Sequence, residues 1–425
     1  MTTSRDRVMA ALAHNEPDRV PIDLGGSAVT GMHVSVVYGL RQALGLDEPG
    51  TPVKVTEPYQ MLGEIKLDLI EALGVDVVSL SSQSTMFGYP LDNWKPWTFF
   101  DGTPVLVPGD FNTDPEPNGD LLMYPGGDKS VAPSARMPEG GFYFDALVRQ
   151  PEILEDELNP VDNLEEFKPI SEDDLVYYER EAERLFTQTD KAILGNFGGT
   201  GFGDIALVPG IQLKDPKGIR DMEEWYMSTI TRRDYVWQVF EKQCEIGLEN
   251  LKRIHERVGE KLTVLFVTGT DFGAQNGPFI SPKAYRDLYA PFHKIINTWV
   301  HENTSWKTFI HSCGSVIKLY PYFLDAGFDI INPVQTSAVG MEPEVLASQY
   351  GDRATFWGGG VDTQQTLPFG TPAEIRAEVH ERMQIFGPGG GFVFNPIHNV
   401  QSGVSVENLM ALYEAVEDFR DYPLK

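Results

Sequence analysis

The chain has 425 residues, of which 62 are acidic and 34 are basic, so that its formal charge is −28. Hydrophobic residues make up 41% of the sequence, enough for a large packed core, which excludes a wholly disordered protein. The acidity argues against nucleic acid and against an anionic membrane surface as partners, because both are bound mainly through Lys and Arg. Cys244 and Cys313 are the two cysteines, which excludes a disulfide scaffold and a four-cysteine zinc site.

The apolar runs are all short. Charged residues, Gly or Pro interrupt each run well before the roughly 20 residues that a membrane-spanning helix needs. Residues 1–20 carry mixed charges and lack the apolar stretch of a signal peptide. We therefore expect a cytoplasmic enzyme.

Short runs rich in β-branched residues alternate with longer amphipathic stretches. Seven runs have the length and composition of parallel strands that are buried on both faces: 75–80, 192–197, 262–267, 308–311, 328–334, 354–357 and 391–394. Helices are expected at 233–257, which has one apolar face, at 371–386, which opens with Thr-Pro, and at 404–420, which starts at Ser405. This alternation predicts a parallel sheet with helical crossovers.

Polar and glycine-rich stretches follow almost every predicted strand, which favours a closed (β/α)8 TIM barrel, where such loops meet on one face. A dinucleotide fold is disfavoured, because GGTGFG at 198–203 has no acidic ribose partner at the expected distance. Residues 86–145 break the alternation with short extended runs and turn signals such as PNGD. We expect one barrel domain over 1–425, with an N-terminal helical extension and a β-rich insertion at about 86–145. The insertion either covers the active-site mouth or is a surface elaboration or dimer contact.

His311 and Cys313 form the strongest chemical signal. They are two residues apart at the end of a predicted strand, so both side chains point the same way and can reach one metal ion. Zinc accepts both ligand types, although a buried cysteine and a hydrogen-bonded histidine would give the same pattern. His398 follows the last predicted strand, and a barrel would bring it to the same face. Two histidines and one cysteine with an open fourth position match a catalytic zinc site; otherwise His398 contacts substrate or acts as a general acid without metal.

Other polar residues also lie at predicted strand ends. Asp271 could be a base, a carboxylate that holds a ligand histidine, or a helix cap, and Asp362 has the same ambiguity. Cys244 lies on the apolar face of a helix and is expected to be an inert core residue. The residues expected to contact a bound substrate are Asn196, Phe197, Gln275, Asn332, Gln335, Asp362 and Asn395.

Five segments, taken in order, resemble the uroporphyrinogen decarboxylase superfamily, and most closely its corrinoid-dependent methyltransferase branch. They are RDRVMAALAHNEPDRVPIDLGG, DFGAQNGPFISPKAYRD, IHSCGSVIKLYPYFLDAGFDIINPVQ, FWGGGVDTQQTLP and GFVFNPIHNVQSGVSVENL. The resemblance spans nearly the whole chain apart from 86–145.

Two departures from the superfamily patterns bear on the expected site. Decarboxylases proper carry an arginine-rich motif where this chain reads VPIDLGGSAVTGMH, which has no arginine, so an anionic tetrapyrrole is electrostatically unfavourable here. The methyltransferases hold zinc with His-x-Cys and a later cysteine. The resemblance assigns the first two ligands to His311 and Cys313, whereas His398 stands in the place of the later cysteine.

The resemblance implies a Zn²⁺ site and a methyl group exchanged with the cobalt of a corrinoid carried on a partner protein. We favour transfer from a small methylated substrate, in which an ether oxygen is polarised and leaves as a phenolate. The aromatic residues of the insertion suggest a lid for a methoxylated aromatic donor: Trp94, Trp97, Phe99, Phe100 and Tyr143. Asp271 and His398 would be catalytic, with Asp271 orienting a ligand or shuttling the proton.

Three alternatives remain open: a methylcobalamin:thiol methyltransferase, a decarboxylase without metal, and a non-catalytic corrinoid-binding protein. A homo-oligomer is compatible with each of them.

Overall fold

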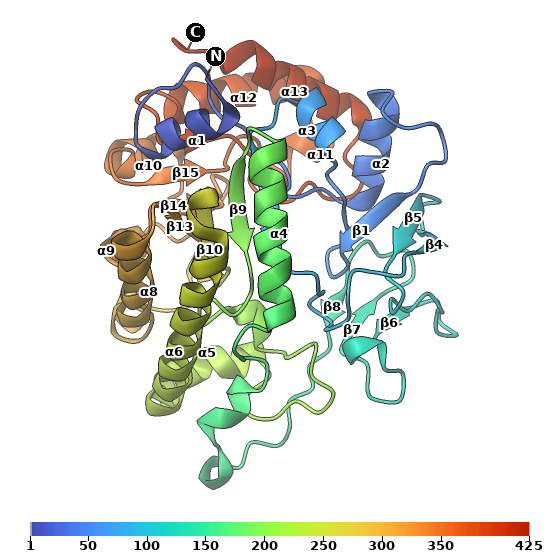
Figure 1. Ribbon diagram of the computed structural model, residues 1–425, viewed down its shortest axis with the longest axis vertical. Coiled ribbons are helices and arrows are strands. Elements are labelled where there is room, and N and C mark those ends of the chain that lie inside the picture. The colour runs from blue at the N-terminus through green and yellow to red at the C-terminus, as the bar shows by residue number, and fades with distance from the viewer. Residues whose placement is uncertain (1, 425) are drawn as a thin grey trace.

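The computed structural model describes residues 2–424, and its centre is a curved sheet of seven parallel strands (Figure 1). The strands are β3 (Val77–Ser81), β9 (Ala192–Asn196), β10 (Val264–Thr268), β13 (Lys307–His311), β14 (Ile330–Asn332), β15 (Thr355–Trp357) and β16 (Phe392–Val393). Their order in the sheet is β16-β15-β14-β13-β10-β9-β3, and every neighbouring pair is parallel. The seven predicted strands are thereby confirmed.

A short extended segment, 20–24, takes the eighth position and closes the barrel. The backbone of Phe394, which follows β16, exchanges hydrogen bonds of 2.8 and 2.9 Å with this segment. On the other side, the amide of Asp76, just before β3, donates to the carbonyl of Ile22 at 2.8 Å. The predicted TIM-barrel class is confirmed, although no strand was predicted at 20–24.

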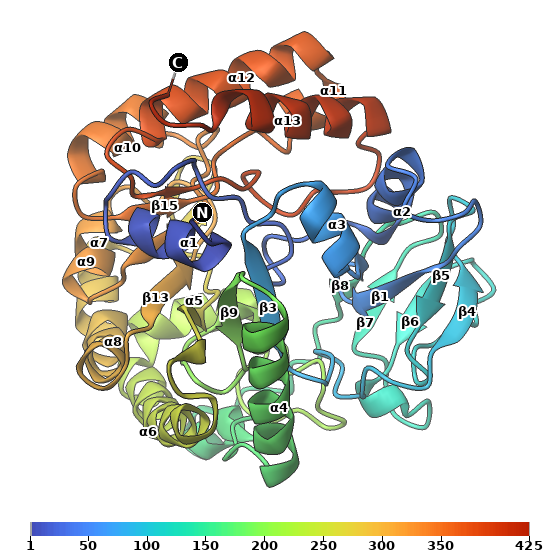
Figure 2. The ribbon, with the colours of Figure 1, turned by 45° about the horizontal axis from the view of Figure 1, so that its top comes forward.

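Helices surround the strands on the outside (Figure 2). The outer layer contains α4 (Glu172–Gln188), α6 (Arg233–Val258), α8 (Ala290–Asn303), α9 (Tyr320–Asp325), α10 (Pro343–Tyr350), α12 (Pro372–Phe386) and α13 (Val406–Phe419). The predicted helix starts are confirmed: Thr371 forms a capping box with Glu374, and Ser405 caps α13. None of the described helices combines the length and apolar character needed to cross a membrane.

The N-terminal helix α1 (Ser4–Leu12) covers the end of the barrel where the strands begin. Its Val8 and Leu12 pack in one cluster with the first residues of several strands, among them Val77, Val264 and Ile330. Burying these apolar side chains is the main stabilising contribution at this end, at about 25 cal/mol per Å² of apolar surface.

Alternation along the strands decides which side chains face the inside of the barrel. Leu194, Phe309 and Ile330 belong to the interior cluster. Because side chains two apart in a strand share a face, the residues two positions later also point inward, at the opposite end of the barrel. They are Asn196, His311 and Asn332. A polar layer therefore lies where the strands end.

A β-rich layer lies beside the barrel (Figure 1). One sheet has the order β2-β1-β5-β4, and the other has the order β6-β7-β8. The strands are β1 (Val53–Glu57), β2 (Leu62–Gly63), β4 (Lys95–Thr98), β5 (Pro104–Val107), β6 (Leu121–Met123), β7 (Ala135–Met137) and β8 (Asp145–Ala146). Since β1 pairs with β5 in parallel, this layer includes residues well before position 86, where the insertion was expected to begin.

Candidate metal centre

Three potential ligands meet where the strands end. His311 is the last residue of β13, and its Nε2 lies 3.3 Å from the Sγ of Cys313. His398 lies in the loop after β16, with its ring centroid 5.5 Å from that of His311. One ligand atom from each of the three residues lies within 4.8 Å of the other two. The barrel thus brings together the three residues that the sequence analysis named as ligands.

The orientation of His311 is fixed from behind by Asn332, the last residue of β14. The Nδ1 of His311 lies 2.6 Å from the Oδ1 of Asn332, whose Nδ2 donates to the carbonyl of Trp357 at 2.8 Å. Because that carbonyl accepts from the Asn332 amide nitrogen, the amide oxygen faces the imidazole, so His311 carries its proton on Nδ1. The lone pair of Nε2 is left pointing at Cys313, as in a histidine that ligates a metal. Asn332 was expected to contact substrate, whereas the structure places it behind His311.

Asp271 shapes the loop that carries Cys313. Its Oδ1 accepts a hydrogen bond of 2.7 Å from the Cys313 amide and lies 3.8 Å from the Nε2 of His311. Burial and the neighbouring Asp271 carboxylate raise the pKa of the Cys313 thiol well above its ordinary value. Such a thiol stays protonated unless a cation shares the site. One role considered for Asp271 was that of a helix cap. Its carboxylate instead caps the Cys313 loop, by accepting from the Cys313 amide.

Gly314 explains why glycine follows the His-x-Cys pair. Its φ is +87°, and a Cβ there would lie 2.3 Å from the backbone carbonyl of Gly273. Any larger residue would push the Cys313 loop away from 273–274, which it packs against.

His398 is only partly exposed, and burial together with the adjacent His311 lowers its pKa to about 4. The imidazole is therefore neutral at pH 7 and has a lone pair available for a metal.

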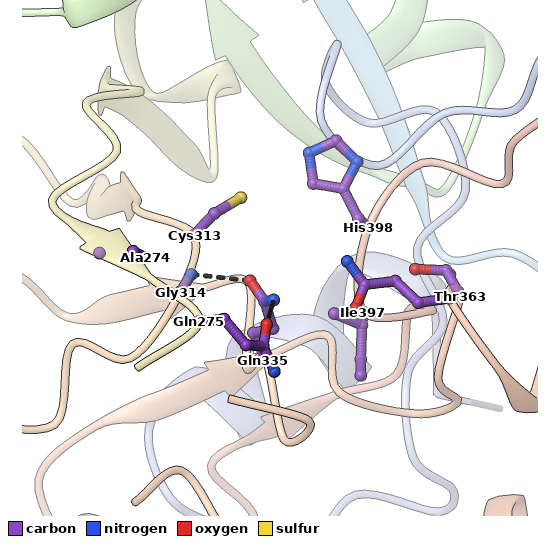
Figure 3. Close-up of a pocket in the computed structure, with 10 residues that line it drawn as sticks. Ala274, Gln275, Cys313, Gly314, Gln335, Thr363, Ile397 and His398 are labelled. Carbon is purple, nitrogen blue, oxygen red and sulfur yellow. Dashed lines mark hydrogen bonds between the residues drawn. The ribbon is translucent and has the colours of Figure 1, made fainter. Parts of the chain in front are cut away.

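A cavity of about 240 Å³ opens beside these ligands. Figure 3 shows the Cys313 sulfur and the His398 ring on opposite sides of the same space, with Gln335 and Gln275 below. Gln335 accepts from the amide of Gly314 at 2.7 Å and donates to Gln275 at 3.3 Å. The cavity is lined by Gly273, Ala274, Gln275, Cys313, Gly314, Gln335, Thr363, Gln364, Ile397 and His398. No Lys or Arg is among these residues, which favours a neutral ligand.

Gln275 and Gln335 are the residues from the expected substrate contacts that line this cavity. The sequence analysis did not name three of the lining residues, Thr363, Gln364 and Ile397. The first two directly follow Asp362, and Ile397 directly precedes His398. Asp362 organises the loop instead of facing the cavity, since its Oδ1 accepts from the amides of Gln364 and Gln365 at 2.6 and 3.0 Å.

Two other expected substrate contacts have structural partners. Phe197 is buried between the barrel and α4, with its ring 4.8 Å from that of Tyr178, so its expected role in binding substrate is corrected to one in the core. Asn395 donates to the carbonyl of Asp23 at 3.0 Å and ties the β16 loop to the segment 20–24. Asn196, the last residue of β9, is partly exposed but does not line the cavity.

Cys244 lies outside the centre, as expected. It is buried on α6, and burial raises its pKa to about 12.

Three aromatic residues of the insertion, Trp97, Phe99 and Phe100, pack on one another, and the cavity lining contains none of the insertion's aromatic residues. Trp97 and Phe99 have ring centroids 5.7 Å apart, and Phe99 lies 5.2 Å from the ring of His33. His33 in turn contacts the carbonyl of Phe142 through Nε2 at 2.9 Å. This aromatic cluster connects the β-rich layer to the segment before α2 (Val34–Ala43), and the lid over the substrate stays a prediction.

Comparison with known proteins shows what this part of the chain is similar to. The profile of the uroporphyrinogen decarboxylase (URO-D) family matches residues 212–419, a range that contains all three potential ligands. A uroporphyrinogen decarboxylase of Pseudoalteromonas atlantica is 21% identical over 210 residues, which are 46% of this chain and 56% of the relative. The chain thus matches about half the length of that relative. The structure of a methyltransferase from Methanosarcina mazei is similar to this chain, with a TM-score of 0.56 and 18% sequence identity. The aligned region covers 98% of this chain and 99% of the methyltransferase, which shows a shared fold.

Proposed function

We propose that this chain, in which residues 212–419 match the uroporphyrinogen decarboxylase (URO-D) family, is a methyltransferase of that superfamily. The proposed reaction moves a methyl group from a small donor, such as a methoxylated aromatic compound, to the cobalt of a corrinoid on a partner protein. The observation that carries the proposal is the convergence of His311, Cys313 and His398 beside a cavity.

The three side chains fit a zinc ion. They offer two imidazole nitrogens and one sulfur, the donor types that zinc prefers, and three protein ligands leave a fourth position open. The Nε2 lone pair of His311 is already directed at Cys313 by Asn332, and His398 is neutral. When bound, zinc would supply Lewis acidity toward an oxygen or sulfur atom of the substrate.

The protein's own residues would hold the donor and handle the proton. In the proposed reaction the methyl–oxygen bond breaks, the methyl group goes to reduced cobalt, and the phenolate oxygen takes up a proton. The Asp271 side chain is 44% exposed and touches the Cys313 loop, so it can exchange a proton between solvent and the site. Gln275 and Gln335 would orient the donor through their amides.

The cavity favours a small neutral donor over a polycarboxylate. Its volume of about 240 Å³ lies below the roughly 300 Å³ at the lower end of ligand pockets, and its lining lacks Lys and Arg. A tetrapyrrole with several carboxylates would need cations that this cavity does not offer. This weighs against the decarboxylase alternative.

The proposal is tested by methyl transfer to a reduced corrinoid. The protein is mixed with cob(I)alamin or a reduced corrinoid protein and a panel of methoxylated aromatics, methylamines and thiols, and the cobalt spectrum is followed. We expect conversion to methyl-cobalt with an aryl ether and loss of that conversion in Cys313→Ser, whereas Cys244→Ser stays active. Absence of any spectral change with every donor would refute the methyltransferase proposal. Demethylation of methyl-cobalt by thiols alone would identify the thiol-directed enzyme instead.

A further inference from the structure

We infer that the β-rich layer positions His398 through a hydrogen-bonded chain from Gln60 to Asn399. Neither residue lies in a barrel strand, and neither lines the cavity. The inference rests on the proposed function, because it concerns the third ligand of the same metal centre.

Asn399 directly follows His398 and is completely buried. Its Oδ1 accepts from the amide of Gly31 at 2.6 Å, and its Nδ2 donates to the carbonyl of Ala28 at 2.8 Å and to the Oε1 of Gln60 at 2.9 Å. Both amide hydrogens are therefore used, so the side chain has one orientation in which its buried groups are satisfied.

The backbone on either side of His398 is anchored in two different places. Before it, the amide of Ile397 donates to the carbonyl of Val361 at 3.0 Å, in the loop after β15. After it, Val400 donates to Gly31 at 3.0 Å and accepts from the amide of His33 at 2.8 Å. One anchor thus belongs to the barrel, and the other belongs to the segment that the β-rich layer packs against.

Gln60 is itself held in the turn between β1 and β2. The Glu57 carboxylate accepts from the amides of Gln60 at 2.7 Å and Tyr59 at 3.1 Å. The end of the insertion closes on the same turn, because Phe144 donates to the carbonyl of Tyr59 at 2.8 Å and the amide of Ala146 donates to its hydroxyl at 3.2 Å. The insertion is thereby connected through Tyr59 and Gln60 to Asn399.

The three ligands are consequently supported by different parts of the molecule. His311 is held by Asn332, the last residue of β14, and the Cys313 loop is held by Asp271, which follows β10. His398 has one anchor in the barrel, at Val361, and a second one outside the barrel strands, through Asn399 and Val400. Loosening the chain at Gln60 should therefore affect His398 and leave the other two ligands in place.

The test is titration of the metal-free full-length protein with Co²⁺, followed by visible absorption. For Gln60→Ala we expect Co²⁺ affinity to fall about 10-fold, the lower end of the effect of removing a group that contacts a ligand directly, because Gln60 acts on His398 through Asn399. The d–d bands should shift toward those of His398→Ala, while the sulfur-to-cobalt band from Cys313 persists. The matched control is Gln42→Ala, which removes another partly exposed glutamine whose Nε2 contacts a carbonyl, that of Glu48, and should bind Co²⁺ as the wild type does.

A double-mutant cycle separates positioning from general destabilisation. Asn399→Ala should weaken Co²⁺ binding. In that background, Gln60→Ala should lower Co²⁺ affinity less than it does in the wild type, because both residues belong to one chain of contacts. Gln60 is only partly buried, so Gln60→Ala keeps the test usable even where Asn399→Ala fails to fold. Wild-type affinity and spectrum in Gln60→Ala would overturn this inference alone. Failure of the wild type to bind Co²⁺ would overturn the metal centre and the inference with it.

Discussion

Replacing Asn332 with alanine should weaken metal binding at a site that the side chain itself does not enter. The substitution removes the acceptor of the His311 Nδ1 proton and the donor to the Trp357 carbonyl. Leaving a buried polar group without a partner costs about 1–3 kcal/mol. Loss of a residue that orients a ligand histidine typically lowers metal affinity 10–100-fold, which corresponds to about 1.4–2.7 kcal/mol of binding free energy.

The assay compares zinc affinity, from competition with a chromophoric chelator, with the free energy of unfolding of the metal-free protein. Asn297→Ala is the matched control, because Asn297 is an equally buried asparagine whose Nδ2 donates to the carbonyl of Ala326 at 3.0 Å. Both variants should be less stable, but only Asn332→Ala should bind zinc more weakly. Equal zinc affinities in wild type and Asn332→Ala, or equal weakening in both variants, would refute the reasoning about His311.

Three further outcomes follow from burial. Phe197→Ala should lower the free energy of unfolding by about 3–5 kcal/mol and leave the KM for the methyl donor unchanged, since the ring packs on Tyr178 and does not face the cavity; a raised KM at unchanged stability would contradict this. Cys244→Ala should retain one zinc per chain by elemental analysis, whereas Cys313→Ala should lose it, and the reverse pattern would exclude the proposed ligand. Burial raises the pKa of Asp23 to about 6, so the folded state holds a proton that the unfolded state releases above about pH 4. That stabilisation is present at low pH and is lost as pH rises through 6. Relative to Asp23→Asn, the wild type should therefore lose about 2 kcal/mol between pH 4 and pH 7 in urea unfolding, and parallel pH profiles would contradict it.

Seven strands of the barrel could be predicted from short apolar runs in the sequence, because these strands are buried on both faces. Each of the seven apolar runs became a strand. The segment 20–24 was missed because it is short, contains Pro21 and makes its hydrogen bonds with Phe394 and Asp76, far away in the sequence. Likewise, the pairing of β1 with β5 depends on contacts between distant segments that local pattern does not encode.

The candidate site was predictable at the level of residue type and less so at the level of role. His311 and Cys313 were found from their spacing, and His398 was found from the expectation that the strand ends of a barrel converge. Alternation along β9 already favoured an inward Asn196 and an outward Phe197, so the misassigned Phe197 had a signal that was not used. The supporting position of Asn332 follows from the register of β13 with β14, which a single sequence does not specify.

The central claim is that His311, Cys313 and His398 together bind one zinc ion. X-ray absorption at the zinc edge of the purified protein tests it most directly, because sulfur and imidazole neighbours scatter differently. The account predicts one zinc per chain with one sulfur at about 2.3 Å and two imidazole nitrogens at about 2.0–2.1 Å, and loss of one imidazole in His398→Ala. A spectrum with two sulfur neighbours, or protein that binds no zinc, would contradict it.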